Sequence, residues 1–438
     1  MSKKEKEKNV EDYNPFEHRE VVNPNSDLRS LANLIKSSLG SGLLAMPLAF
    51  SNAGWGVGIV GTVVVAFICG HCVHIFVETS RGCCRLERKP LLSYSETCGA
   101  AFANGPKCVR PFANFAHLFA EFSLCFTYLG VCCIFTVLIA TSIKQLFDTY
   151  LTTTLAMPVE QYCLILLAPL CLLCQIRHLK WLAPFSLLAN ALLFTTFAIC
   201  LYYIFKEPLK ISDKEVVGDL SRLPAFLSTV IFAMEGIGVV MPVENTMKKP
   251  QHFLGCPSVM IIAMTLVMLF YTILGVFGYL RYGDVLRGTI TLNLPMDDWP
   301  AIFAKIFISI TIFLTYPLHF FVVIDIFTRY VEPRVPKKYH NVMQISTRII
   351  IVCFCGGIGI ALPFLEQIIN LVGALFYSIL GLIIPGIVET VFRWEDLGKY
   401  NWILYKNILI IFCGMFSLVS GCTVTINDTI ELINTKTV

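Results

Sequence analysis

Long runs of apolar residues, separated by short polar segments, dominate the chain from Leu31 onward. A membrane-spanning helix needs about 20 consecutive, mostly apolar residues, and eleven runs approach that length, with the fourth and the ninth shorter than the rest. They cover Leu31–Phe50, Gly56–Val77, Leu118–Ile143, Tyr162–Cys174 with its flanks, Trp181–Phe205, Leu223–Val243, Ser258–Leu280, Ala301–Ile326, Ile349–Pro363, Ile368–Val388 and Asn407–Ile426. The pattern predicts an all-α polytopic membrane protein with eleven transmembrane helices.

Composition agrees with this prediction. Charged residues make up 15% of the 438-residue chain and apolar residues 56%, whereas an ordinary soluble domain has about 25% charged residues. Such a chain cannot cover a soluble surface, and its net charge of +4 leaves no broad basic face for nucleic acid. No nucleophile–base pair or set of metal ligands falls within the apolar runs, so we expect no enzyme activity and no cofactor.

Lys and Arg test the order of the runs, because cytoplasmic loops carry an excess of both. With the N-terminus in the cytoplasm and the runs alternating, most of the 34 Lys and Arg residues fall in inner segments. We therefore expect a flexible cytoplasmic tail over residues 1–30, five-helix repeats over 31–205 and 206–390, and over 391–438 a linker, the eleventh helix and a short outer C-terminus.

The first and the sixth runs are interrupted midway. Each holds two glycines near its middle and a proline beyond them: Gly40, Gly42 and Pro47 in the first, Gly236, Gly238 and Pro242 in the sixth. Both residue types weaken a helix, and non-helical backbone at membrane depth is tolerated only in a cavity or inside protein. Glycines also serve as packing notches between helices, but two broken helices in opposite orientation indicate a 5+5 inverted-repeat transporter.

The two breaks predict the kind of ligand. The second half of the first run begins at Ser41–Leu43, where free N–H groups and the helix dipole suit a carboxylate. The first half of the sixth run ends near Phe232–Met234, where free carbonyls suit an ammonium group. Together they predict a zwitterionic α-amino acid. The candidate substrate-binding residues are Ser38, Gly40, Ser41, Gly42, Leu43, Tyr128, Phe232, Met234, Glu235, Gly236 and Thr315.

Ionisable side chains inside the runs are functional candidates, because a charge at membrane depth is costly. Glu235 lies at the second break, where it could bind the substrate ammonium, carry a coupling proton or accept backbone N–H groups. His319 lies well inside the eighth run, where it could carry a proton or simply bond a neighbour. His71 and His74 share one helix face in the second run, and we expect them to pack at the interface rather than bind a metal.

At the breaks, the segments NLIKSSLGSGLLAMPLAFSNAG and IFAMEGIGVVMPVENTMKKPQHF resemble the proton-coupled amino acid transporters, a branch of the amino acid/auxin permease family. EDYNPFEHR, HCVHIFV and YLGVCCIFTVLIA are similar to insect members, and the resemblance extends from about Tyr13 to Thr425. It implies the LeuT-like fold of eleven helices with a 5+5 inverted repeat. It also implies transport of small neutral amino acids such as glycine, alanine and proline, often with a proton as the coupling ion.

Three positions depart from the pattern of that branch. Asn33 stands where proton-coupled members carry a His, so no proton is carried there. His319 stands where members usually have Gln, and Leu48 stands where many have a polar residue. The main expectation is a secondary active transporter that works by alternating access with a proton. A proton-independent facilitator and an amino-acid sensor remain the alternatives.

Short patterns suggest where the protein is sent. They are an acidic dileucine at 87–92, a tyrosine signal at 13–16, the palmitoylation candidates Cys83 and Cys84, and a doubtful glycosylation sequon at Asn427. These patterns favour the plasma membrane or a lysosomal or endosomal membrane. The expected partners are amino acids, the lipid bilayer, and cytosolic sorting adaptors or signalling proteins.

Overall fold

The computed structural model describes residues 13–21, 24–150, 157–177, 179–209, 211, 213–234, 236–256 and 258–437. Over these residues the regular structure is helical, and one isolated bridge joins Asn25 to Met247. Nine helices of the described chain are long and apolar enough to cross a membrane, and a bent pair makes a tenth. The expected fourth span is an apolar helix of only 15 residues, Val159–Leu173. The all-helical membrane fold is therefore confirmed, whereas the described residues give nine or ten full-length spans rather than eleven.

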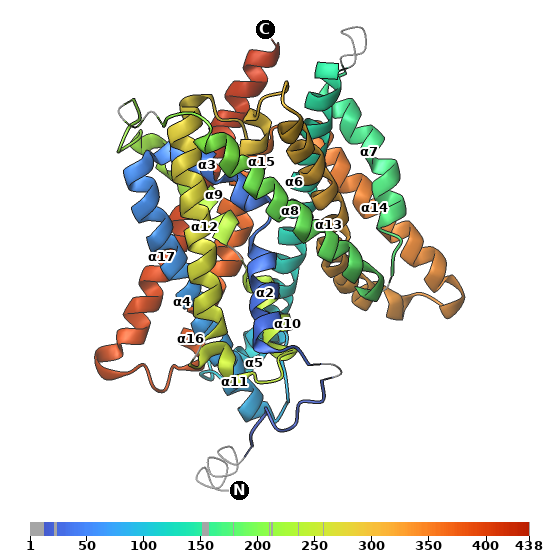
Figure 1. The fold of residues 1–438 in the computed structure, drawn as a ribbon. Coiled ribbons are helices and arrows are strands. Elements are labelled where there is room, and N and C mark those ends of the chain that lie inside the picture. Colours follow the sequence, from blue (N-terminus) through green and yellow to red (C-terminus); the bar gives the residue numbers. More distant parts are fainter. Residues whose placement is uncertain are drawn as a thin grey trace, which may run out of the picture.

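The helices are named as in Figure 1, which shows them as one bundle with the N- and C-termini at opposite ends. Their bounds are α2 Asp27–Ser38, α3 Ser41–Ala53, α4 Trp55–Glu87, α5 Tyr94–Ala103, α6 Ala113–Tyr150, α7 Val159–Leu173, α8 Leu179–Phe205, α9 Leu223–Met234, α10 Ile237–Asn245, α11 Gln251–Leu254, α12 Val259–Tyr282, α13 Trp299–Val331, α14 His340–Ala361, α15 Leu365–Val372, α16 Ile384–Phe392 and α17 Trp402–Thr437. The π-helical stretches η8 (Gly373–Tyr377) and η9 (Ile379–Ile383) join α15 to α16. We call the end of the bundle that holds the N-terminus the N-side face.

Both predicted interruptions are present. The first span consists of α2 and α3, which meet at Leu39–Gly40 and are bent by 51°. The sixth consists of α9, which ends at Met234, and α10, which begins at Ile237. Gly40 and Gly236 therefore stand at real ends of helices, as the residues just before α3 and α10, whereas Pro47 and Pro242 lie inside those helices.

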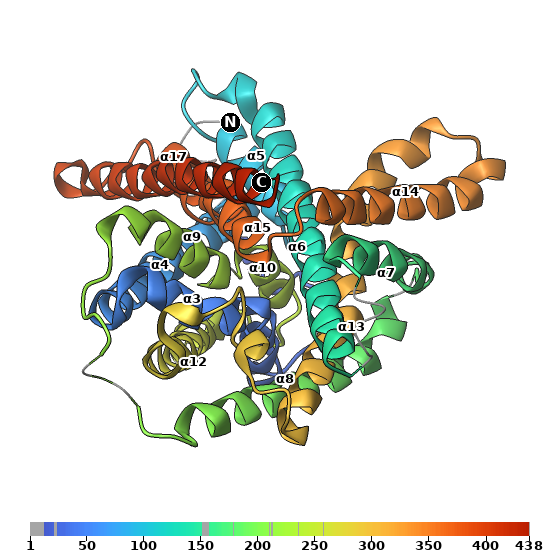
Figure 2. The same cartoon turned by 90° about the horizontal axis from the view of Figure 1, so that it is seen from above.

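Helices at matching places of the two expected repeats pack against each other. The first broken span contacts the sixth through α3 and α9, α4 contacts α12, α6 contacts α13, and α7 contacts α14. Seen from above, α7, α13 and α14 lie on one side of the bundle, and α3, α4 and α12 lie on the other (Figure 2). These contacts place both breaks inside the bundle.

Helix α4 is longer than the apolar run that predicts it. It continues ten residues past Val77, to Glu87. At 1.5 Å per residue it is about 50 Å long, whereas the hydrocarbon core of a bilayer is about 30 Å thick. Its last turns therefore extend beyond the apolar layer, and Arg81, expected in a loop, lies on this helix.

Several residues of the expected sorting and modification signals are buried in the structure. Leu92 of the dileucine is only 1% exposed, and the side chains of Cys83 and Cys84 are buried within the bundle. An adaptor or an acyltransferase cannot reach these atoms in this conformation. Asn427 is exposed but lies within α17, which runs on to Thr437, so the expected short outer C-terminus is helical and the sequon is not in a loop.

Helix α5 links the N-side face to the last part of the second repeat. It begins with a capping box, in which the Ser93 N–H donates to Glu96 (2.8 Å) and the Glu96 N–H donates to the Ser93 hydroxyl. The next residue, Tyr94, donates its hydroxyl to the carbonyl of Leu380 in η9 (2.6 Å). A π-helical stretch disturbs the regular bonding of its carbonyls, and Tyr94 satisfies one of them.

Part of the expected flexible tail is packed against the N-side face. Arg19 forms an ion pair with Glu244 of α10 at 3.0 Å, and Arg81 of α4 binds the same carboxylate at 3.1 Å. The side chains of Arg19 and Glu244 are only 4% and 1% exposed. Arg19 also donates to the carbonyl of Pro90 at 2.9 Å. We call Phe16, Arg19, Arg81 and Glu244 the Glu244 cluster.

Phe16 completes this cluster. Its ring lies 5.0 Å from the guanidinium carbon of Arg19 and 5.1 Å from that of Arg81. Both distances are within the range of cation–π attraction. The cluster therefore joins the N-terminal segment, α4 and α10 into one contact that covers the N-side end of the bundle.

Candidate functional site

The two breaks face each other at close range. A Cβ atom built on Gly236 would lie 3.2 Å from the hydroxyl oxygen of Ser38, and one built on Gly42 would lie 2.7 Å from the Cα atom of Ala233. The start of α3 is thus pressed against the end of α9. Four residues predicted to form the site are brought together here or lie next to the contact: Ser38, Gly42, Met234 and Gly236.

Gly40 and Gly42 have different surroundings, although the sequence gives no reason to distinguish them. At Gly42 a side chain would meet the backbone of Ala233, which cannot move aside as the tip of a flexible side chain can. At Gly40 no atom lies within 4 Å of the Cβ position. The close approach of the two broken spans therefore depends on Gly42, while Gly40 borders open space at the break.

The start of α3 has the features on which the predicted anion site depends. Ser41, Gly42 and Leu43 are its first three residues, and their N–H groups precede the first intrahelical bonds. The Leu43 N–H makes only a long bond of 3.3 Å to the Gly40 carbonyl. Because α3 is a helix of 13 residues, its dipole adds positive potential at this end.

Helix α6 contributes Tyr128 to the same region. Its hydroxyl lies 2.5 Å from the Cβ position of Gly238, in the first turn of α10. The ring of His319 from α13 lies 5.6 Å from the ring of Tyr128 and 5.1 Å from that of Phe135. The structure therefore brings His319 next to Tyr128, a residue predicted to contact the substrate.

The hydroxyl of Thr315 is less available to bind a substrate than the sequence predicts. Its hydroxyl donates to the Thr311 carbonyl of its own helix at 2.7 Å. The Thr315 carbonyl, in turn, lies 3.4 Å from Nδ1 of His319. The Thr315 hydroxyl is therefore engaged within its own helix, and the contact of Thr315 with His319 is made by its carbonyl.

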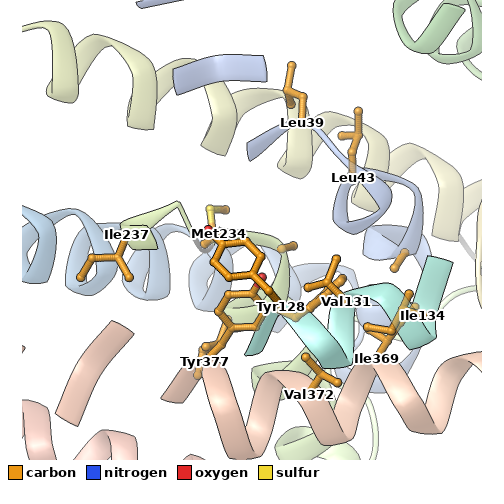
Figure 3. Packing of buried hydrophobic residues seen from close by; sticks show 14 of the residues in the cluster. Leu39, Leu43, Tyr128, Val131, Ile134, Met234, Ile237, Ile369, Val372 and Tyr377 are labelled. Carbon is orange, nitrogen blue, oxygen red and sulfur yellow. The ribbon is translucent and has the colours of Figure 1, made fainter. Parts of the chain in front are cut away.

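The walls around the breaks are apolar. Figure 3 shows buried side chains from both breaks together with others from α6 and from the last span of the second repeat. They are Leu39, Leu43, Tyr128, Val131, Ile134, Met234, Ile237, Ile369, Val372 and Tyr377. Phe232 packs its ring against that of Tyr377, with centroids 5.7 Å apart. The wall residues that were not among those predicted from the sequence are Leu39, Val131, Ile134, Ile237, Ile369, Val372 and Tyr377.

Tyr271 of α12 was also not predicted as a site residue. It occupies backbone carbonyls that the sequence analysis expects to be free at the breaks. Its buried hydroxyl is bonded to the Ser38 carbonyl and, at 2.7 Å, to the Ala233 carbonyl. The ammonium site predicted at Phe232–Met234 therefore has one of its carbonyls already taken. A tyrosine in the middle of an apolar run was the available signal, but its partners lie 38 and 233 residues away in the chain.

Glu235 lies outside the described residues, so its predicted roles as an ammonium ligand or proton carrier stay predictions. Over the part of the chain that the structure describes, no group of His, Cys, Asp and Glu side chains is arranged to hold a metal ion. His71 and His74 are included in that statement. Among the described ionisable side chains, His319 lies against Tyr128, a predicted substrate residue.

Comparison with known proteins agrees with this architecture. Residues 24–427 match the family described as transmembrane amino acid transporter protein. The chain is 39% identical over 421 residues to the proton-coupled amino acid transporter-like protein pathetic of Drosophila melanogaster, an alignment that covers 96% of this chain and 88% of the relative. It is 25% identical over 428 residues to the amino acid transporter ANT1 of Arabidopsis thaliana, covering 92% of each.

Among solved structures, a manganese transporter from Eremococcus coleocola shares the fold, with a TM-score of 0.53, 10% identity and 92% of both chains covered. At this identity the similarity concerns the fold alone. The family match, in contrast, spans nearly the whole chain, including both breaks and the helices packed around them. This chain therefore belongs to the transmembrane amino acid transporter family.

Proposed function

We propose that the protein is a secondary active transporter of small neutral amino acids, coupled to protons and working by alternating access. The observation that carries this proposal is the direct contact of the two breaks between apolar walls. The start of α3 suits the carboxylate of an amino acid, and the carbonyls at the end of α9 suit its ammonium group. Buried residues such as Leu39, Leu43 and Ile237 favour a small, uncharged side chain.

Proton coupling rests on a separate set of observations. Asn33 cannot titrate, so the proton needs another carrier. His319 lies beside Tyr128, and a relative 39% identical to this chain is named proton-coupled. We assign the coupling role to His319, with Glu235 as the second candidate. The distribution of Lys and Arg supports a cytoplasmic N-terminus, and we therefore take the N-side face as the cytoplasmic one.

Uptake of radiolabelled alanine and proline into proteoliposomes tests the function. We expect saturable uptake that an inward proton gradient accelerates and drives above equilibrium. Uptake that only equilibrates, with or without the gradient, would identify a facilitator instead. Binding of either amino acid without flux would identify a sensor, and neither binding nor flux would contradict the proposed substrate class.

A substitution at His319 tests the coupling group. We expect uptake by the unchanged protein to rise as the outside pH falls from about 7.5 to about 5.5, because the inward proton gradient increases over this interval. His319→Gln should flatten this dependence, because an amide keeps the hydrogen bonding but cannot carry the proton. His340→Gln, at the start of α14, is the matched control and should keep the wild-type profile. An unchanged profile in His319→Gln would move the role to Glu235.

A further inference from the structure

The hydroxyl of Tyr271 connects the two broken spans at a single point. Ser38 is the last residue of α2, and Ala233 is the last but one of α9, so their carbonyls belong to the C-terminal ends of both first half-helices. Such carbonyls have no partner in their own helix. Tyr271 reaches both from a third helix, α12, and its side chain is 0% exposed. One buried donor therefore serves the C-terminal end of the first half-helix in each broken span.

The chemistry at this point is that of a cation site. In transporters with discontinuous helices, unwound carbonyls and the C-terminal ends of half-helices coordinate the coupling cation. A phenolic hydroxyl has one proton to donate, and here two carbonyl oxygens converge on it. The Ser38 carbonyl also accepts from the N–H of Gly40 at 2.8 Å, which ties the hydroxyl to the backbone of the break itself.

We propose that Tyr271 is a positioning residue whose hydroxyl stands in for a metal cation between the two breaks. This hydroxyl donates hydrogen bonds to the carbonyls that a sodium ion would otherwise bind. The two broken spans therefore close on each other without such an ion. The hydroxyl belongs to the protein, and it is present in every state of the transport cycle. Substrate binding and closure are then independent of Na⁺, which leaves the proton free to be the coupling ion.

The Tyr271 hydroxyl can also maintain its contact with the breaks when the distance between the two carbonyls changes. The two carbonyls lie on different broken spans, at Ser38 of α2 and Ala233 of α9, so any relative displacement of these spans changes their separation. Rotation about the C–O bond of Tyr271 lets its proton follow either carbonyl, so one bond is kept when the other lengthens. Removal of the hydroxyl alone, with the ring retained, leaves two buried carbonyls without this donor and a gap between them.

The test is thermal unfolding of the purified, full-length protein in detergent, with NaCl or choline chloride at equal ionic strength. We expect NaCl to raise the Tm of Tyr271→Phe by at least about 2 °C over choline chloride, because an ion that binds only the folded state stabilises it. The unchanged protein should show the same Tm in both salts. Tyr282→Phe, a tyrosine at the end of the same helix, is the matched control and should behave like the unchanged protein.

Transport gives a second measurement in the same variants. The transport measurement rests on the proposed function, whereas the unfolding experiment does not depend on it. In choline medium we expect uptake by Tyr271→Phe to fall at least tenfold, and in sodium medium to recover in part. Three results would overturn the assignment: Na⁺ stabilisation of the unchanged protein, no effect of Na⁺ on the Tm of Tyr271→Phe, or wild-type uptake by that variant in choline.

Discussion

Uptake should fall at least tenfold when one methyl group is added at the first break, in Gly42→Ala. The new Cβ atom would lie 2.7 Å from the Cα atom of Ala233, so α3 and α9 must separate. Overpacking of this kind costs about 1–3 kcal/mol, and about 1.4 kcal/mol corresponds to a factor of ten in an equilibrium. The measurement is initial uptake in proteoliposomes, normalised to reconstituted protein, and Gly42→Leu should abolish it.

Gly40→Ala is the matched control, two residues away on the same break. Its new methyl group meets no atom within 4 Å, so the variant should fold, reconstitute and retain its maximal rate. A change confined to KM would indicate that the space beside Gly40 is occupied by substrate. Wild-type uptake by Gly42→Ala, or equal losses in both variants, would contradict the packing of the two breaks described above.

Removal of the carboxylate in Glu244→Gln should be the most damaging single change at the N-side face. Arg19 and Arg81 both pair with this buried group, and without it two guanidinium groups face each other around a neutral amide. Breaking a buried ion pair in this way costs about 3–5 kcal/mol. We expect a lower Tm, and faster proteolysis of the N-terminal segment after it is released from the cluster.

Asp148→Asn provides the comparison. Asp148 pairs with Lys144 four residues away on α6, and both side chains are partly exposed. Such pairs contribute about 0–1 kcal/mol, so the Tm should hardly change and the N-terminal segment should stay protected. If Glu244→Gln matched this control in both measurements, the Glu244 cluster would not be what holds the N-terminal segment in place.

The sequence was informative where the signal is local. Gly40, Gly42, Gly236 and Gly238 interrupt apolar runs, and both interruptions are helix ends in the structure. Glycine and proline act on the backbone within a turn of their own position, so their effect can be predicted without knowing the fold. The same holds for the apolar runs themselves, which predict most spans to within a few residues.

The missed features all depend on partners far away in the chain. Arg19 and Glu244 are 225 residues apart, and Tyr271 lies 233 residues from Ser38. A single sequence contains no sign of which arginine meets which carboxylate. The length of α4 was missed for a related reason, because the polar residues after Val77, which include Arg81, end the apolar run without ending the helix. The charge of Arg81 is offset by Glu244, which lies on another helix.

The position of Phe16 has a consequence for anything that binds the N-terminal segment. Residues 13–16 match a tyrosine sorting signal, yet the Phe16 ring is in contact with the guanidinium groups of Arg19 and Arg81. A partner that takes this ring must first free it, so its apparent affinity falls in proportion to the fraction of molecules with a released segment. By reciprocity, the partner stabilises those molecules. Recognition of this signal would thus report whether a given copy has its N-side face closed or open.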